Sequence, residues 1–160
     1  MSCARGVLAA LAVDRLAGLD VPSGDLVAAG VRAVVEGLDS PSLPELAGSD
    51  DRAAVDLFTQ VIDELGIELP ADAESARWQL LGRCLGVMVR GEVPLGEAAT
   101  SFDELDGRLG RPDALAELRR WFALLAAWIP TDVTPLSFCA QQIRQQARQL
   151  LAGPWPPVTR

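Results

Sequence analysis

The sequence contains no histidine, lysine, tyrosine or asparagine, so arginine is its only basic residue. Without histidine, the chain has no side chain whose ordinary pKa lies near neutrality, no Ser-His or Cys-His pair, and none of the commonest metal ligand. Without lysine, it can form neither a Schiff base nor the lysine contact of a P-loop. An enzyme built from this chain would work with Asp, Glu, Cys, Ser, Thr and Arg alone. The absences therefore favour a protein that is not a catalyst, and we expect no cofactor and no metal.

Cysteine is also scarce, and its spacing indicates no disulfide framework. Cys3, Cys84 and Cys139 lie far apart and form no CxxC pair, so the sequence predicts neither disulfides nor a zinc site. Cys84 and Cys139 fall on apolar helical faces, where a free cysteine behaves as a small buried hydrophobe. We expect core thiols at both positions, with a reactive thiol as the alternative.

Long apolar runs are missing too. No stretch reaches the roughly 18 residues that a membrane-spanning helix needs. Arg5 followed by GVLAALA resembles a secretory signal, but the apolar run is short, and Asp14 and Arg15 follow after one more valine. An amphipathic first helix explains this segment better, so we expect a soluble, cytoplasmic protein with no membrane partner.

Apolar and acidic residues are what the sequence has in quantity. Its 160 residues are 49% hydrophobic and 22% charged, a composition typical of globular domains. The net charge of −8 is uneven, because residues 1–70 contain four arginines and twelve acidic residues, whereas residues 71–160 contain ten of each. We expect one helical domain over residues 1–160, with an acidic sub-half 1–70, a neutral sub-half 71–152 and a Pro/Trp tail 153–160.

The spacing of the apolar residues predicts helices throughout. They recur at intervals of three and four, and the strict alternation of strands is missing, so we expect an all-α fold: a compact bundle of seven to eight short amphipathic helices with no β-sheet. Ser23, Ser42 and Ser49 are candidate N-caps. The expected helices span residues 5–19, 23–38, 42–48, 50–65, 73–90, 94–109, 115–129 and 135–152. The expected apolar face of the second comprises Leu26, Val27, Gly30, Val31, Val34, Val35 and Leu38.

The segment WQLLGRCLGVMVRGEVPLGEAATSF, residues 78–102, looks at first like a motif because glycines and a proline interrupt it. Its apolar residues fall into two separate helical stripes, which begin at Trp78 and Leu95. We therefore predict a corner between two helices, with Gly91 in a left-handed C-cap and Pro94 in or just before the first turn of the next helix. A continuous helix would contradict this prediction.

Three acidic residues are candidates for a partner contact. Asp50, Asp51 and Asp56 lie at the start of the fourth expected helix, away from its apolar stripe. Acids at a helix start also interact favourably with the helix dipole, and clustered carboxylates can hold a hard cation. A solvated acidic face is the simpler interpretation of the cluster, so we assign no metal site to it.

Aromatic residues supply the other candidates. Trp155 stands among prolines in a stiff tail, which loses little entropy on docking. It is either an exposed partner contact or a cap whose indole folds back on the bundle. Trp78, Trp121, Phe122 and Trp128 are candidates for the lining of an apolar pocket.

Nucleic acid is an unlikely partner because binding rests largely on neutralising phosphates, and this chain has a net charge of −8. The helix that would have to read bases, residues 94–109, presents Glu97, Asp103, Glu104 and Asp106 instead of arginine or amides.

Two segments resemble a known group of proteins. Residues 34–48 read VVEGLDSPSLPELAG, and residues 76–99 begin ARW and end RGEVPLGEAA. They are similar to the "GLDSPxLxxLAG" turn and the tryptophan helix ending in "GExxPxEGA" of small, uncharacterised all-helical actinobacterial proteins. Gly96-Glu97-Ala98 replaces the glutamate, glycine, alanine order of that pattern. The resemblance implies a helical fold and carries no catalytic residues.

Together these features predict a non-catalytic protein-interaction module. An acidic face can mask the basic rim of another protein, as an immunity-like or antitoxin-like partner would. The partner is expected to be another protein, and a second copy of this chain is one form it can take. The alternative is a small-molecule-binding or enzymatic helical bundle, which a cavity with convergent arginine and carboxylate groups would support.

Overall fold

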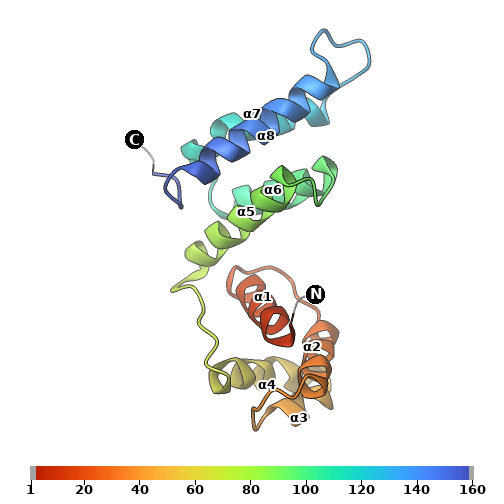
Figure 1. Cartoon of the computed structure of the whole chain (residues 1–160), viewed down its shortest axis with the longest axis vertical. Helices are drawn as coiled ribbons and strands as arrows, with labels where there is room; N and C mark the ends of the chain where they lie inside the picture. The colour runs from red at the N-terminus through yellow and green to blue at the C-terminus, as the bar shows by residue number, and fades with distance from the viewer. Residues whose placement is uncertain (1–2, 159–160) are drawn as a thin grey trace. The chain divides into compact units, whose positions relative to one another are not determined.

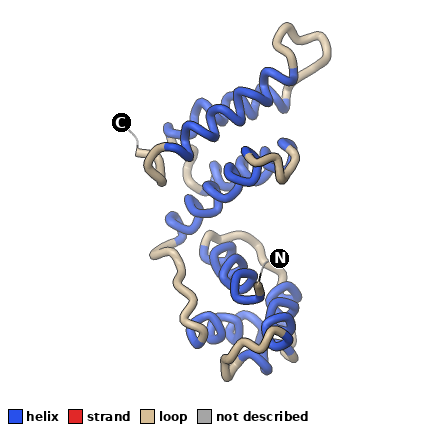
Figure 2. The backbone as a smooth tube through the Cα atoms, viewed as in Figure 1, coloured by secondary structure: helices blue, strands red, loops and turns tan. Residues whose placement is uncertain are grey.

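The computed structural model describes residues 3–158, and across them the regular structure consists of eight α-helices and one short 3₁₀ helix, with no strand (Figure 2). The all-α prediction is therefore confirmed. The chain divides into two compact units, Met1–Ala76 and Arg77–Arg160. This division falls six residues after the expected boundary at residue 70, and the expectation of one domain stays a prediction. Residues 159–160 of the expected tail lie outside the described residues.

The first unit contains α1 (Ala4–Leu16), α2 (Ser23–Val35), α3 (Leu43–Ala47) and α4 (Asp51–Glu64) (Figure 1). Its core is continuous across all four helices and includes Leu8, Leu26, Leu46 and Phe58, each at most 1% exposed. Glycines with positive φ, among them Gly37 and Gly66, follow helix ends in this unit. They allow the tight turns that bring such short helices together.

The second helix differs from its prediction. Its buried face consists of Leu26, Ala29, Gly30 and Ala33, whereas Val31, Val34 and Val35 are exposed by 45%, 44% and 80%. The physical reason is close packing against α3, since a Cβ added at Gly30 would lie 2.9 Å from Cγ of Leu46. Small residues are needed on this face, and the valines point outward.

Of the three predicted serine caps, Ser42 lies at the N-cap position of its helix and the other two do not. Asp50, not Ser49, caps α4: its carboxylate accepts hydrogen bonds from the backbone amides of Arg52 and Ala53 at 3.2 and 3.0 Å. Neither Ser42 nor the residue before Ser23 makes a side-chain cap bond to its helix.

The second unit is built from α5 (Ala73–Val89, whose first four residues precede the division), α6 (Leu95–Arg108), the 3₁₀ turn η1 (Asp113–Leu115), α7 (Ala116–Ala126) and α8 (Leu136–Ala152). Helices α7 and α8 pack against each other as a hairpin (Figure 1). The core includes Leu81, Leu85, Met88, Leu118 and Ile143, all at most 1% exposed. Helix α7 ends three residues before the expected end, which leaves Ile129 53% exposed in the following loop.

The predicted corner between α5 and α6 is confirmed. Gly91 has φ of 72°, and the amides of Gly91 and Glu92 donate to the carbonyls of Met88 and Val87 at 3.0 and 2.9 Å. These two bonds are the Schellman pattern of a helix end. Pro94 is the N-cap of α6.

Candidate functional site

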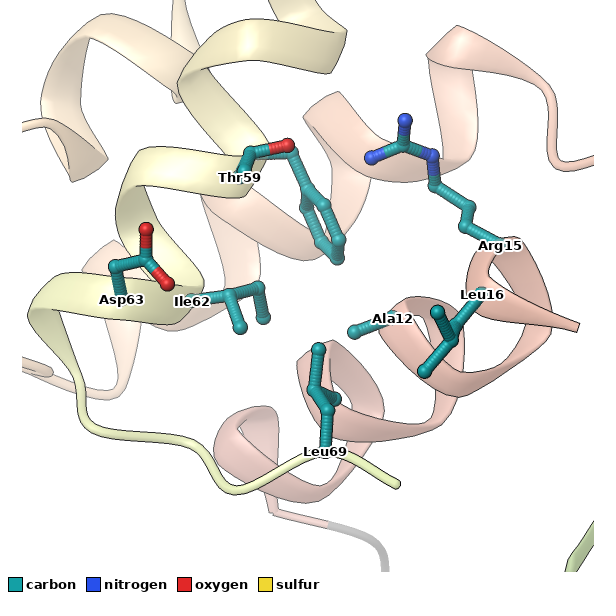
Figure 3. Close-up of a pocket in the computed structure, with 8 residues that line it drawn as sticks. Ala12, Arg15, Leu16, Thr59, Ile62, Asp63 and Leu69 are labelled. Carbon is teal, nitrogen blue, oxygen red and sulfur yellow. The ribbon is translucent and has the colours of Figure 1, made fainter. Parts of the chain in front are cut away.

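A groove lies between α1 and α4 in the first unit, with a cavity of about 240 Å³ (Figure 3). The amphipathic stripes of the two helices supply its walls, and the segment after Gly66 adds one leucine. Its lining comprises Ala12, Arg15, Leu16, Phe58, Thr59, Ile62, Asp63 and Leu69. The floor is apolar, so the groove can accept an apolar side chain or a small ligand.

Charged groups of opposite sign stand at the edges of this groove. Figure 3 shows Arg15 and Asp63 on opposite sides, with Ala12 and Ile62 between them. The Arg15 guanidinium lies 5.8 Å from the centroid of the Phe58 ring, within range of a cation–π contact. Within residues 3–158, neither Arg15 nor Asp63 forms an ion pair. Both charges are therefore open to an incoming molecule.

The three predicted acidic contacts lie on α4 and differ in role. Asp50 is occupied as the helix cap. Asp51 and Asp56 are exposed, and no hydrogen bond or ion pair of their side chains occurs in the part of the chain that the structure describes. Asp56, Thr59 and Asp63 follow at i, i+3 and i+7, so the free carboxylates of Asp56 and Asp63 share the side of α4 that carries the groove. The sequence did not single out Arg15 or the groove.

Glu64, the neighbour of Asp63, has a structural role instead. Its carboxylate accepts hydrogen bonds from the Ser40 hydroxyl, from the Ser42 hydroxyl at 2.6 Å and from the Ser42 amide at 2.9 Å. These bonds, that of Ser40 above all, lower the pKa of Glu64. They tie the end of α4 to the loop before α3, so this acid is not available to a partner.

The four aromatic pocket candidates have different surroundings. Trp121 meets Phe138 edge to face, with centroids 5.8 Å apart. Trp128 donates from Nε1 to the carbonyl of Thr134 at 2.9 Å and lines a different cavity from Phe122. Trp78 is buried.

The tail folds back on its own unit. Trp155 packs edge to face on Trp78 at 5.7 Å and donates from Nε1 to the Trp78 carbonyl at 2.9 Å. Gly82 makes room for the indole, because a Cβ added there would lie 3.1 Å from Nε1 of Trp155. Gly82 and Gly86 are four residues apart in α5, and the absence of a side chain at Gly82 admits the tryptophan ring.

The three cysteines have different surroundings. Cys139 is buried as expected and Cys84 is half-buried, with burial raising the pKa of the Cys84 thiol. Cys3 is exposed, and its Sγ accepts a bond from the Gly6 amide at the start of α1. Among residues 3–158, no three His, Cys, Asp or Glu side chains are grouped so that they could hold a metal ion.

Comparison with protein-family models, with curated proteins and with solved structures gives no match for this chain. Within the described range, no helix combines the length and apolar character that crossing a membrane requires.

Proposed function

We propose that this protein is a non-catalytic docking module whose first unit binds a basic, amphipathic segment of another protein. The observation that carries the proposal is the groove between α1 and α4, where an apolar floor lies beside the unpaired carboxylate of Asp63, two helical turns from the exposed Asp56 on the same side of α4. An amphipathic helix binds such a groove by inserting apolar anchors. Its lysines and arginines would face the two carboxylates.

The charge of the unit supports a basic partner. Residues 1–76 contain four arginines and fourteen acidic residues, a net charge of −10, whereas residues 77–160 carry +2. A field of one sign steers an oppositely charged partner and raises the association rate. More specifically, we propose that the protein masks a basic functional surface of its partner, as immunity-like or antitoxin-like proteins do, and that it does so in the cytoplasm.

The test is affinity capture from the native host, followed by titration of the identified partner at low and at high ionic strength. The charge variant is Asp56→Asn/Asp63→Asn. The matched control is Asp20→Asn/Asp39→Asn, which removes two exposed acids of the same unit that do not line the groove. A third variant, Thr59→Trp, fills the groove and leaves the charge unchanged.

Each exposed ion pair contributes about 0.2 to 1 kcal/mol, so loss of two should weaken binding by about twofold to about thirtyfold. The control should weaken it less, and Thr59→Trp should weaken it at every ionic strength. A partner that binds equally well at both ionic strengths would contradict the proposal. So would a groove variant that behaves like the control.

A further inference from the structure

The second unit contains a separate cavity of about 340 Å³ between α6 and α7. Its lining comprises Ala99, Phe102, Asp103, Arg111, Arg119, Phe122, Ala123 and Ala126. Phe102 and Phe122 are stacked, with centroids 4.8 Å apart and planes at 28°, and both are buried. The volume is at the small end of the range for ligand pockets, and a mostly apolar lining with a few charged groups is typical of such sites.

One of the two arginines is already committed to the fold. Arg119 donates from Nε and Nη2 to the two carboxylate oxygens of Asp106 at 2.6 and 2.9 Å, and from Nη2 to the Pro112 carbonyl at 3.0 Å. Asp106 is 1% exposed, and its bonds hold the pKa of Arg119 above the ordinary range. Arg119 therefore forms a fixed, charge-neutralised wall of the cavity.

Arg111 and Asp103 carry the free charges. Across residues 3–158, no ion pair includes either of them, and neither side chain has a hydrogen bond. Arg111 has φ of 54°, in the left-handed region that favours glycine, directly after Gly110 at 77°. A branched or long side chain is rarely kept in that conformation without a reason, and such outliers cluster at binding sites. Here the conformation places a free guanidinium in the cavity lining.

We propose that this cavity binds a free α-amino acid with a large apolar side chain. The ligand's carboxylate pairs with Arg111, its ammonium pairs with Asp103, and its side chain lies against the stacked phenylalanines. The two free charges match a zwitterion, whereas a simple acid or amine would leave one of them unpaired at the pocket. This site is independent of the groove between α1 and α4.

Three probes dissect the proposal: L-phenylalanine, 3-phenylpropionate, which lacks the amine, and phenethylamine, which lacks the carboxylate. Binding to the full chain is measured by NMR chemical-shift titration. Arg111 and Asp103 are both exposed, and an exposed ion pair corresponds to about 1.4- to fivefold in affinity, so L-phenylalanine should bind more tightly than either fragment by about that factor.

Two variants assign the charges. Arg111→Gly should weaken binding of L-phenylalanine and 3-phenylpropionate by about 1.4- to fivefold and leave phenethylamine unchanged. Asp103→Asn should weaken L-phenylalanine and phenethylamine and leave 3-phenylpropionate unchanged. The control Arg148→Gln removes an exposed arginine of α8 and should bind all three probes like the parent.

Loss of folding cannot mimic this pattern, because glycine suits the backbone of residue 111 and Arg111→Gly should melt at the parent's temperature or above it. Absence of binding by L-phenylalanine in the millimolar range overturns the proposal. Equal affinity of either fragment also overturns it, as does an Arg111→Gly protein that binds L-phenylalanine like the parent.

Discussion

Replacing Arg119 by methionine should destabilise the second unit by about 3 kcal/mol. The side chain of Asp106 is 2% exposed and that of Arg119 is 29% exposed, so the change leaves a buried carboxylate without its cation. Removing one partner of a buried pair costs roughly 3 to 5 kcal/mol. Because Arg119 is partly exposed, solvent screens the pair, and the lower end of that range applies. The loss is a large fraction of the 5 to 15 kcal/mol that stabilises a typical domain.

The matched variant is Asp106→Leu/Arg119→Met, which replaces the whole pair with apolar side chains. Such replacements are often neutral, so we expect the double variant to lose about 1 kcal/mol or less. The coupling between the two changes should then be about 2 kcal/mol plus the cost of Asp106→Leu alone, since the residues are in direct contact.

Urea denaturation followed by tryptophan fluorescence is a suitable assay, because all four tryptophans lie in the second unit. The midpoint should shift without a change in the denaturant slope. A loss below about 1 kcal/mol for Arg119→Met, or a double variant as unstable as the sum of the single ones, would refute the reasoning.

Three further changes test other parts of the fold. Glu64→Gln should destabilise the protein near neutral pH. The difference from the parent should disappear as pH falls through the lowered pKa of Glu64, because the parent's carboxylate is then protonated too. Circular dichroism in urea across this pH range measures it, and a difference that persists in acid would contradict it. Gly91→Ala should cost about 1 to 2 kcal/mol, because φ is 72° and the space around it is open. The control Gly96→Ala, within α6, should stabilise the protein by about 0.5 to 1 kcal/mol in the same urea titration. A Gly91→Ala protein as stable as the parent would contradict a strained turn. Trp155→Phe should cost about 1 kcal/mol, because it removes the hydrogen bond to the Trp78 carbonyl and keeps an aromatic ring. A fluorescence-monitored denaturation midpoint equal to the parent's would show that this bond does not stabilise the fold.

The existence of the helices was predictable because their apolar residues repeat strongly and glycine and proline separate them. At the corner between α5 and α6, Gly91 and Pro94 each have a conformational preference that only a helix end or a helix start satisfies. Local conformational preferences determine the structure at such positions. The sequence alone is therefore enough to predict it.

The buried face of α2 was not predictable in the same way. Hydrophobicity ranks valine above alanine, so the pattern favoured Val31, Val34 and Val35. The contact between Gly30 and Leu46 selects the opposite side, because two helices approach closely only over small side chains. That requirement depends on which helix packs there, and the sequence of α2 alone does not contain it.

The same limit applies to the charged residues of the candidate sites. Asp106 was expected among the acids that its helix presents, but it follows Phe102 by one helical turn and lies on the buried face. Its partner is thirteen residues away, beyond a turn whose geometry rests on the left-handed Arg111. The groove in the first unit is a further example, since Arg15 and Asp63 come from helices that are far apart in the sequence.

The absence of histidine and lysine, which argued against catalysis, also limits the kinds of charged side chain at both proposed sites. Their charged groups are arginines and carboxylates alone: Arg15, Asp56 and Asp63 at the groove, Asp103 and Arg111 at the cavity. Side chains of these two kinds ordinarily keep their charge between about pH 5 and 8. Interactions between exposed charges are largely screened by salt beyond a Debye length of about 8 Å at physiological ionic strength. Because Asp103 and Arg111 are exposed like Asp56 and Asp63, ionic strength should affect binding at both sites.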